Sequence, residues 1–182
     1  MSLENAKENL KEFGKELNLQ LSFDENNTCI LGIDNTFSLH LTYEPHSDRL
    51  YLYSPVIDGL PKDDATKLKL YEDLLEGSML GGQMAGGGVG VAVKEELILM
   101  HCVLEMGVGS DASALRRFAP IFVEAVERWR KRANDIKEGR SVDPLMPPGG
   151  AARPGSMPGG GPQQGGGEPP TGPSGNDRFI KI

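Results

Sequence analysis

The stretch FSLHLTYEPHSDRLYLYS, residues 37–54, decides the fold class of this chain. In its first half, apolar residues alternate with polar ones, at Phe37, Leu39, Leu41 and Tyr43. A period of two is that of a strand with one apolar and one polar face. The turn-forming residues 45–48 follow, and residues 49–54 run back as a partner strand. The stretch therefore predicts an antiparallel hairpin.

Helical and strand-like patterns surround this hairpin. Upstream, Leu3, Ala6, Leu10, Phe13 and Leu17 recur at helical spacing, and strand-like runs follow at residues 19–23 and 29–33. Downstream, a second helix is expected to begin at Asp63 or Asp64 and to end at Gly77. Strand-like runs at residues 89–93 and 97–104 precede a long amphipathic helix that starts near Asp111 and contains Pro120.

This order of elements predicts an α+β fold in which helices pack on a small antiparallel sheet: helix, three or four strands, helix, two strands, helix. The second helix is apolar over more than one face, through Leu68, Leu70, Tyr71, Leu74 and Leu75. A helix with so wide an apolar surface usually packs against two neighbours. We therefore expect a homodimer.

Composition divides the chain into two parts. Residues 141–182 contain 20 Gly and Pro among 42 residues, too few apolar side chains to offset chain entropy, and predict a disordered Gly/Pro-rich tail. Residues 1–140 form the predicted domain. The basic and acidic side chains of the tail cancel, so the net charge of −7 lies on that domain. Such acidity disfavours nucleic-acid and anionic membrane partners.

The sequence also carries signals of cellular location. The first residues lack a basic stretch followed by an apolar run, so no signal peptide is predicted, and the apolar run at 97–104 is too short to insert in a membrane. Cys29 and Cys102 both lie in apolar, strand-like runs, as buried free thiols of a reducing compartment do. These features predict a cytoplasmic protein.

No combination of side chains predicts an enzyme, a metal site or a cofactor site. His40, His46 and His101 are scattered and form no ligand spacing with the two cysteines. The glycines at 86–90 precede a strand, whereas a phosphate-binding loop must open a helix. A bulge or a close backbone approach explains these glycines better. We therefore predict a binding protein without catalytic residues.

Three segments of the chain carry a further signal: LYEDLLEGSMLG at 70–81, the strand-like Leu97-Ile98-Leu99, and FVEAVERWR at 122–130. Together they resemble the Tir chaperone (CesT) family, the class I chaperones of type III secretion. The resemblance covers residues 4–135 and is closest to the SycE-like branch of chlamydia-type bacteria. The long Gly/Pro-rich tail has no counterpart in the family pattern.

The resemblance implies a cytoplasmic homodimer that binds an extended N-terminal segment of secreted effector proteins and keeps it ready for the type III secretion ATPase. Carried onto this sequence, the effector-binding surface of the family would use Leu10, Phe13, Leu17, Leu39, Leu41, Tyr43, Leu50 and Leu52. The dimer interface would use Tyr71, Leu74, Leu75, Val89, Val91 and Val93.

A different reading is an adaptor or scaffold that recruits partners through its Pro/Gly-rich tail. The tail contains Pro144-Leu145-Met146-Pro147, but glycine dominates it and basic flanking residues are sparse. This composition favours a flexible linker over a polyproline ligand.

Overall fold

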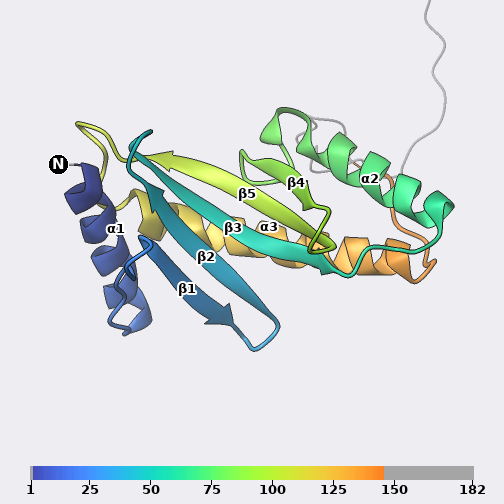
Figure 1. Cartoon of the computed structure of the whole chain (residues 1–182), viewed down its shortest axis with the longest axis horizontal. Helices are drawn as coiled ribbons and strands as arrows, with labels where there is room; N and C mark the ends of the chain where they lie inside the picture. The colour runs from blue at the N-terminus through green and yellow to red at the C-terminus, as the bar shows by residue number, and fades with distance from the viewer. Residues whose placement is uncertain (1, 146–182) are drawn as a thin grey trace, which may run out of the picture. The chain divides into compact units, whose positions relative to one another are not determined.

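A single antiparallel sheet organises the part of the chain that the structure, a computed structural model, describes, namely residues 2–145 (Figure 1). Its strands lie in the order β1-β2-β3-β5-β4. Their bounds are β1 Thr28–Ile33, β2 Phe37–Glu44, β3 Arg49–Asp58, β4 Gly88–Ala92 and β5 Leu97–Glu105. The helices are α1 Ser2–Leu17, α2 Asp64–Ser78 and α3 Ala114–Lys137, with a short 3-10 turn η1 at Met79–Gly81. The predicted fold class is confirmed.

The predicted hairpin is the β2–β3 pair, in which Leu41 pairs with Leu52 and Tyr43 with Leu50. The strand-like run at 19–23 forms no strand. The chain instead turns back on α1 directly after Asn18, whose φ is 55°, and the Leu19 amide donates to the Gly14 carbonyl at 2.9 Å. A side chain at Gly14 would lie 2.6 Å from the Leu19 carbonyl oxygen. The segment thus packs against the helix.

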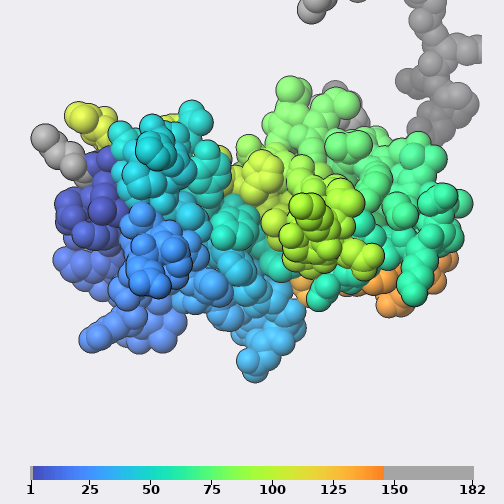
Figure 2. Space-filling model, viewed as in Figure 1, coloured from blue at the N-terminus to red at the C-terminus, as the bar shows by residue number. Residues whose placement is uncertain are grey.

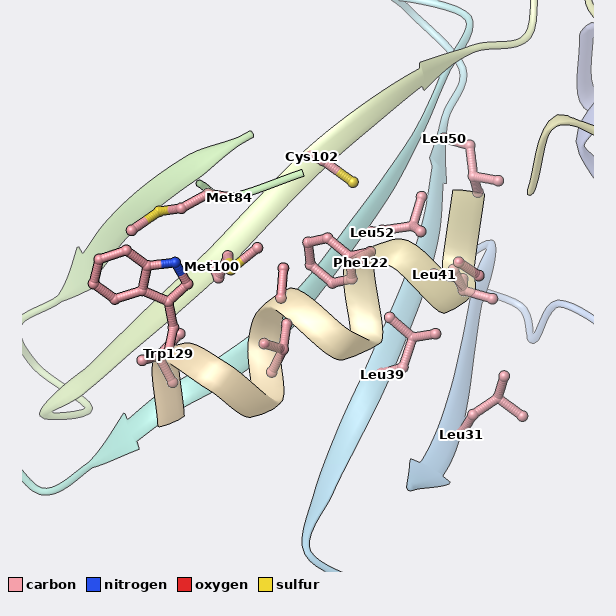
Figure 3. Packing of buried hydrophobic residues seen from close by; sticks show 14 of the residues in the cluster. Leu31, Leu39, Leu41, Leu50, Leu52, Met84, Met100, Cys102, Phe122 and Trp129 are labelled. Carbon is pink, nitrogen blue, oxygen red and sulfur yellow. The ribbon is translucent and has the colours of Figure 1, made fainter. Parts of the chain in front are cut away.

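Helix α3 lies along one face of the sheet and supplies its two largest buried side chains, Phe122 and Trp129 (Figure 3). Helix α1 packs against the same helix. The fully buried Asn9 caps α3 from α1, because its Oδ1 accepts a hydrogen bond from the Leu115 amide at 3.0 Å. The helix therefore begins after Ser113, slightly later than the sequence pattern indicates, and it continues through Pro120.

Helix α2 stands at the end of the sheet and packs on α3 and β4 (Figure 1). Asp63 caps it through a 2.8 Å hydrogen bond from the Thr66 amide. Gly77 does not end the helix, which continues to Ser78. A Cβ at Gly77 would lie 2.2 Å from the Trp129 ring. The glycine is therefore required for close approach of α2 to α3.

The loop between η1 and β4 is equally tight. Gly81 has a φ of +65°, and a Cβ there would lie 2.6 Å from the backbone of Gly86. The indole Nε1 of Trp129 donates to the Gln83 carbonyl at 2.9 Å. The glycines in this stretch thus have structural roles, as the sequence indicated, and the loop closes over the indole ring.

The second face of the sheet is turned toward the viewer in Figures 1 and 2, and no helix of residues 2–145 covers it. We call this the open face. It carries Ile30, His40, Tyr51, Tyr53, His101 and Val103, and the strand register puts Thr42, Glu44, Arg49 and Glu105 on the same side. His40 stacks on Tyr53 with ring centroids 4.9 Å apart, and its Nε2 lies 2.8 Å from Ser38 Oγ. Partial burial lowers the pKa of the His40 imidazole.

After α3 the chain turns back along that helix. Val142 and Leu145 pack against the core, and Arg132 Nη1 donates to the Asp143 carbonyl at 2.6 Å. The rest of the predicted tail, residues 146–182, lies outside the described residues. Among the helices of the described chain, none has both the length and the apolar character needed to cross a membrane.

The contact between Gly77 and Trp129 predicts a strong effect of a single methyl group. Gly77→Ala places a Cβ 2.2 Å from the indole ring and should lower the free energy of unfolding by about 1–3 kcal/mol. Gly32→Ala, in β1, is the matched control, because a Cβ there meets nothing within 4 Å. Urea unfolding followed by circular dichroism measures both. Equal stability of the two variants would contradict the packing described.

The lowered pKa of His40 predicts that stability depends on pH. In the unfolded chain His40 protonates first, so stability is lost as the pH falls below about 6.5 and through the lower pKa of the folded state. His40→Gln removes this proton uptake. Urea unfolding at about pH 7.5 and 5.5 should show a larger loss in the wild type than in the variant. An identical pH dependence in both proteins would show that His40 does not contribute.

Candidate functional site

The structure places seven of the eight predicted effector-binding residues in the core. Their side chains are at most 6% exposed: Leu10, Phe13, Leu39, Leu41, Tyr43, Leu50 and Leu52. Only Leu17, at the end of α1, is substantially exposed, at 43%. Of the strand residues in this set, Leu39, Leu41, Leu50 and Leu52 point toward α3 (Figure 3). Their role in binding stays a prediction, and in this conformation an effector could contact only Leu17 directly.

The burial of these residues has a simple cause. Alternation in β2 and β3 identifies two faces of the sheet, and the more apolar face is the one on which α3 packs. The residues that remain accessible alternate with these buried apolar residues along each strand, and they include His40, Tyr51 and Tyr53. The pattern itself thus marks the accessible set, as the complement of the apolar one.

Both edges of the sheet are further candidate binding features. Among residues 2–145, strand β1 pairs only with β2, and β4 pairs only with β5. The Tyr43 amide donates to the Asn27 carbonyl, and bonded positions alternate along an antiparallel pair. The backbone groups of Ile30 and Gly32 therefore point away from β2, toward the free edge. An edge of this kind can accept an additional strand.

The six predicted dimer residues divide into an exposed and a buried group. Leu75, Val91 and Val93 are 65%, 42% and 72% exposed. Tyr71 and Val89 are partly buried against the core, and Leu74 is 1% exposed. Helix α2 thus has two apolar sides, one in the core and one at the surface.

Three residues that the sequence analysis did not assign to the interface extend this exposed group. Leu68 is 58% exposed, Met79 is 55% exposed and Leu80 is 90% exposed. Leu80 also has a φ of 55°, a conformation that is unfavourable for a branched side chain. We call the set the α2–β4 surface: Leu68, Leu75, Met79, Leu80, Val91 and Val93. The sequence did contain a signal for this extension, because the apolar residues Met79 and Leu80 directly follow the end of α2.

Helix α2 is fixed in place from its other side. Arg132 on α3 forms a bidentate ion pair with Asp73, with Nε and Nη2 each 2.6 Å from a carboxylate oxygen. Hydrogen bonding to Asp73 raises the pKa of the guanidinium, which also lies 5.8 Å from the centre of the Trp129 ring. The α2–β4 surface therefore rests on a well-packed support.

The thiols and histidines do not form a reactive cluster in the described part of the chain. Burial raises the pKa of Cys102 to about 12 and also raises that of Cys29, so both remain protonated thiols near neutral pH. Within residues 2–145, no three His, Cys, Asp or Glu side chains lie where they could hold a metal ion. The features available for binding in the described residues are therefore the α2–β4 surface, the open face and the edges of the sheet.

Comparison with solved structures finds a similar fold in chaperone–effector complexes. A chain from the structure of the HopA1–SchA chaperone–effector complex is 28% identical, with a TM-score of 0.56 over 72% of this chain and 97% of that chain. A chain from the ExsC–ExsE complex is 14% identical, with a TM-score of 0.56 over 70% of this chain and 92% of that one. This second likeness shows the fold alone.

A third solved structure is that of the Yersinia pestis type III secretion chaperone SycH with a fragment of YscM2, which also shows only the fold. It is 18% identical, with a TM-score of 0.51 over 68% of this chain and 98% of that chain. A search of curated protein sequences gave no match. The model of the Tir chaperone protein (CesT) family matches residues 8–130. Because this match covers more than half of the chain, it shows that the chain belongs to the Tir chaperone protein (CesT) family.

Proposed function

We propose that this protein is a cytoplasmic type III secretion chaperone. It binds an extended N-terminal segment of a secreted effector, keeps that segment soluble and non-globular, and presents it to the secretion ATPase. Membership of the CesT family over residues 8–130 is the observation that carries this proposal. The role is one of binding and not of catalysis. Assignment to the SycE-like branch is part of the same proposal and rests on sequence resemblance.

The free edge of β1 is the proposed contact for an extended segment. An added strand there would bond to the backbone groups of Ile30 and Gly32, which gives affinity without requiring a particular sequence. The net charge of −7 favours effector segments that are basic and speeds their encounter with the chaperone. Leu17, the accessible member of the predicted set, remains a proposed side-chain contact.

We also propose that two copies associate through their α2–β4 surfaces. This surface is apolar, exposed and supported from behind by the Asp73–Arg132 pair. Contiguous exposed apolar patches are uncommon on monomeric proteins and usually mark a protein–protein interface. A pair of copies related by a twofold axis would bury the same residues on both sides.

Two neighbouring leucines test the dimer. Leu75→Asp puts a charge on the α2–β4 surface, where the wild-type side chain is 65% exposed. The variant should sediment as a folded monomer, because a buried unpaired charge costs several kcal/mol at an interface but little in solvent. Sedimentation velocity at micromolar concentration measures the association state, and circular dichroism verifies folding.

The control is Leu74→Ala, since Leu74 is 1% exposed and faces the core. It should cost about 2–5 kcal/mol of stability and leave association unchanged when the protein is folded. A wild-type protein that sediments as a monomer throughout the micromolar range would refute the dimer. Dissociation by both variants alike would place the interface elsewhere.

The function is tested by purifying the tagged full-length chain from its native cell and identifying bound proteins by mass spectrometry. We expect a secreted effector that is retained through its N-terminal segment and lost when that segment is deleted. Gly32→Pro, which removes an amide hydrogen at the free edge of β1, should weaken capture at least tenfold. Gly32→Ala keeps the amide and should bind normally, since a Cβ meets nothing within 4 Å. Recovery of no secreted protein, or binding through a folded effector domain, would contradict the proposal.

A further inference from the structure

We propose that residues 178–182 of this chain, Arg-Phe-Ile-Lys-Ile, bind along the free edge of β1 as an added strand and hold that edge until an effector displaces them. The displacement rests on the proposed function, whereas the contact itself does not. Residues 178–182 lie outside the described part of the chain, so what supports the contact is the described edge of β1 together with the sequence of the tail.

The edge of β1 combines unpaired backbone with apolar surface. The backbone groups of Ile30 and Gly32 point away from β2, and the Ile30 side chain is 59% exposed. On the other side of the sheet, the Ser22 backbone hydrogen-bonds to the Cys29 side chain, which places the segment after α1 beside this edge. Leu19 in that segment is 52% exposed. An added strand would therefore find apolar contacts on both sides of the sheet.

Gly32 leaves a gap in the exposed row of β1. A Cβ at this position would meet nothing within 4 Å, and Ile30 is its neighbour in the same row. An aromatic side chain on an adjacent strand often covers a glycine at a sheet edge. Phe179 is the only aromatic residue of the sequence beyond Leu145. In an added strand its ring could lie over Gly32 and against Ile30.

Residues 178–182 are the part of the tail that has the composition of a strand. All 11 Gly and 8 Pro of residues 146–182 precede residue 176, and the only Leu, Ile, Val or aromatic residues in that range are Phe179, Ile180 and Ile182. Branched and aromatic side chains favour strands. With Phe179 on the exposed side, alternation puts both isoleucines on the side that continues the core-facing row of β1.

Acidic side chains flank both ends of β1. Asp24 and Glu25 precede the strand, Asp34 follows it, and residues 16–48 contain no Lys or Arg. Among the described residues, these three carboxylates form no ion pair. The edge is therefore suited to a strand with basic side chains.

The proposed occupant has the complementary charge. Arg178 and Lys181 are two of the three basic residues in the sequence beyond Leu145. Arg130 of α3 approaches the turn after β1 but donates to the Thr36 carbonyl there, at 3.1 Å. Attraction between the acidic edge and the basic segment favours their encounter and aligns the strand along the edge.

The length of the tail permits this contact. Val142 and Leu145 pack against the core, and the 32 residues 146–177 connect Leu145 to the segment. A flexible Gly-rich chain of that length spans about 30 Å, close to the diameter of about 35–40 Å of a compact domain of this size. Tethering supplies an effective concentration on the order of 1 mM, so a contact with a Kd of about 0.1–1 mM would be occupied at least half of the time.

A nitroxide in the tail tests the contact without an effector. Full-length protein with Ser174→Cys takes the label selectively, because both native thiols are buried and burial raises their pKa. The label should broaden the amide signals of residues 28–33 and leave those of the α2–β4 surface unchanged. Phe179→Asp should restore the signals of β1. Met157→Asp adds the same charge elsewhere in the tail and should leave the broadening as it is.

A synthetic peptide of residues 176–182 measures the competition for the edge. It should bind the Phe179→Asp chain about twofold to tenfold more tightly than the wild type, in which the tethered segment already occupies the site. A peptide with Gln at both basic positions should bind at least threefold more weakly. Gly32→Pro should remove both the peptide binding and the nitroxide effect, and Gly32→Ala, which keeps the amide, should retain both.

Three results would overturn the proposal. The first is an absence of broadening at β1, and the second is broadening that Phe179→Asp leaves unchanged. The third is broadening of isotope-labelled protein without nitroxide when it is mixed with nitroxide-bearing protein, which would assign the contact to a second copy.

The tail contact and the proposed function fail in different ways. Effector capture that is lost in Gly32→Pro, with no effect of Phe179→Asp on the β1 signals, would leave the chaperone function intact and remove the tail contact. Nitroxide broadening at β1 without any secreted protein in the native purification would support the tail contact and remove the proposed function.

Discussion

The packing of α3 along one face of the sheet is the constraint on which the rest of the structure depends. Helix α3 contacts β3, β5, α1 and α2, so it joins every layer of the domain. Phe122 lies over the central strands (Figure 3), and Trp129 packs against Gly77 of α2. The close approach at Trp129 requires the glycine at position 77. Its indole N–H then fixes the loop at Gln83.

This arrangement determines which surfaces remain for binding. A single long helix can cover only one face of a twisted sheet, so the face that carries Tyr51, Tyr53 and Val103 stays open. Because β3 pairs with β5, the short strand β4 becomes one edge and β1 the other. The two proposed contact regions, namely the free edge of β1 and the α2–β4 surface, are both consequences of that layout. They lie on different parts of the domain and can be tested separately.

Much of the fold could be predicted from sequence because it depends on local periodicity. Apolar residues recur every two positions at Phe37–Glu44 and at helical spacing in the segment that ends at Ile136. These two periods identify a strand and a helix because each element buries one apolar face away from water. The segment at 19–23 shows where this reasoning fails. Its composition is that of a strand, but the short turn at Asn18 returns it to α1. Local propensity was overridden by a tertiary contact at Gly14.

The sequence by itself determined the helices and strands, the acidic domain and the family resemblance, since each depends on residue type and spacing along the chain. Only the tertiary structure decided which apolar residues are core and which are accessible. Leu74 and Leu75 are adjacent and chemically identical, yet one is 1% exposed and the other 65%. Leu52 and its neighbour Tyr53 lie on opposite faces of β3. Alternation in the sequence separates those two faces, but only the packing of α3 decides which of them is buried. Accessibility depends on where α3 lies, and that position results from contacts between residues far apart in the sequence.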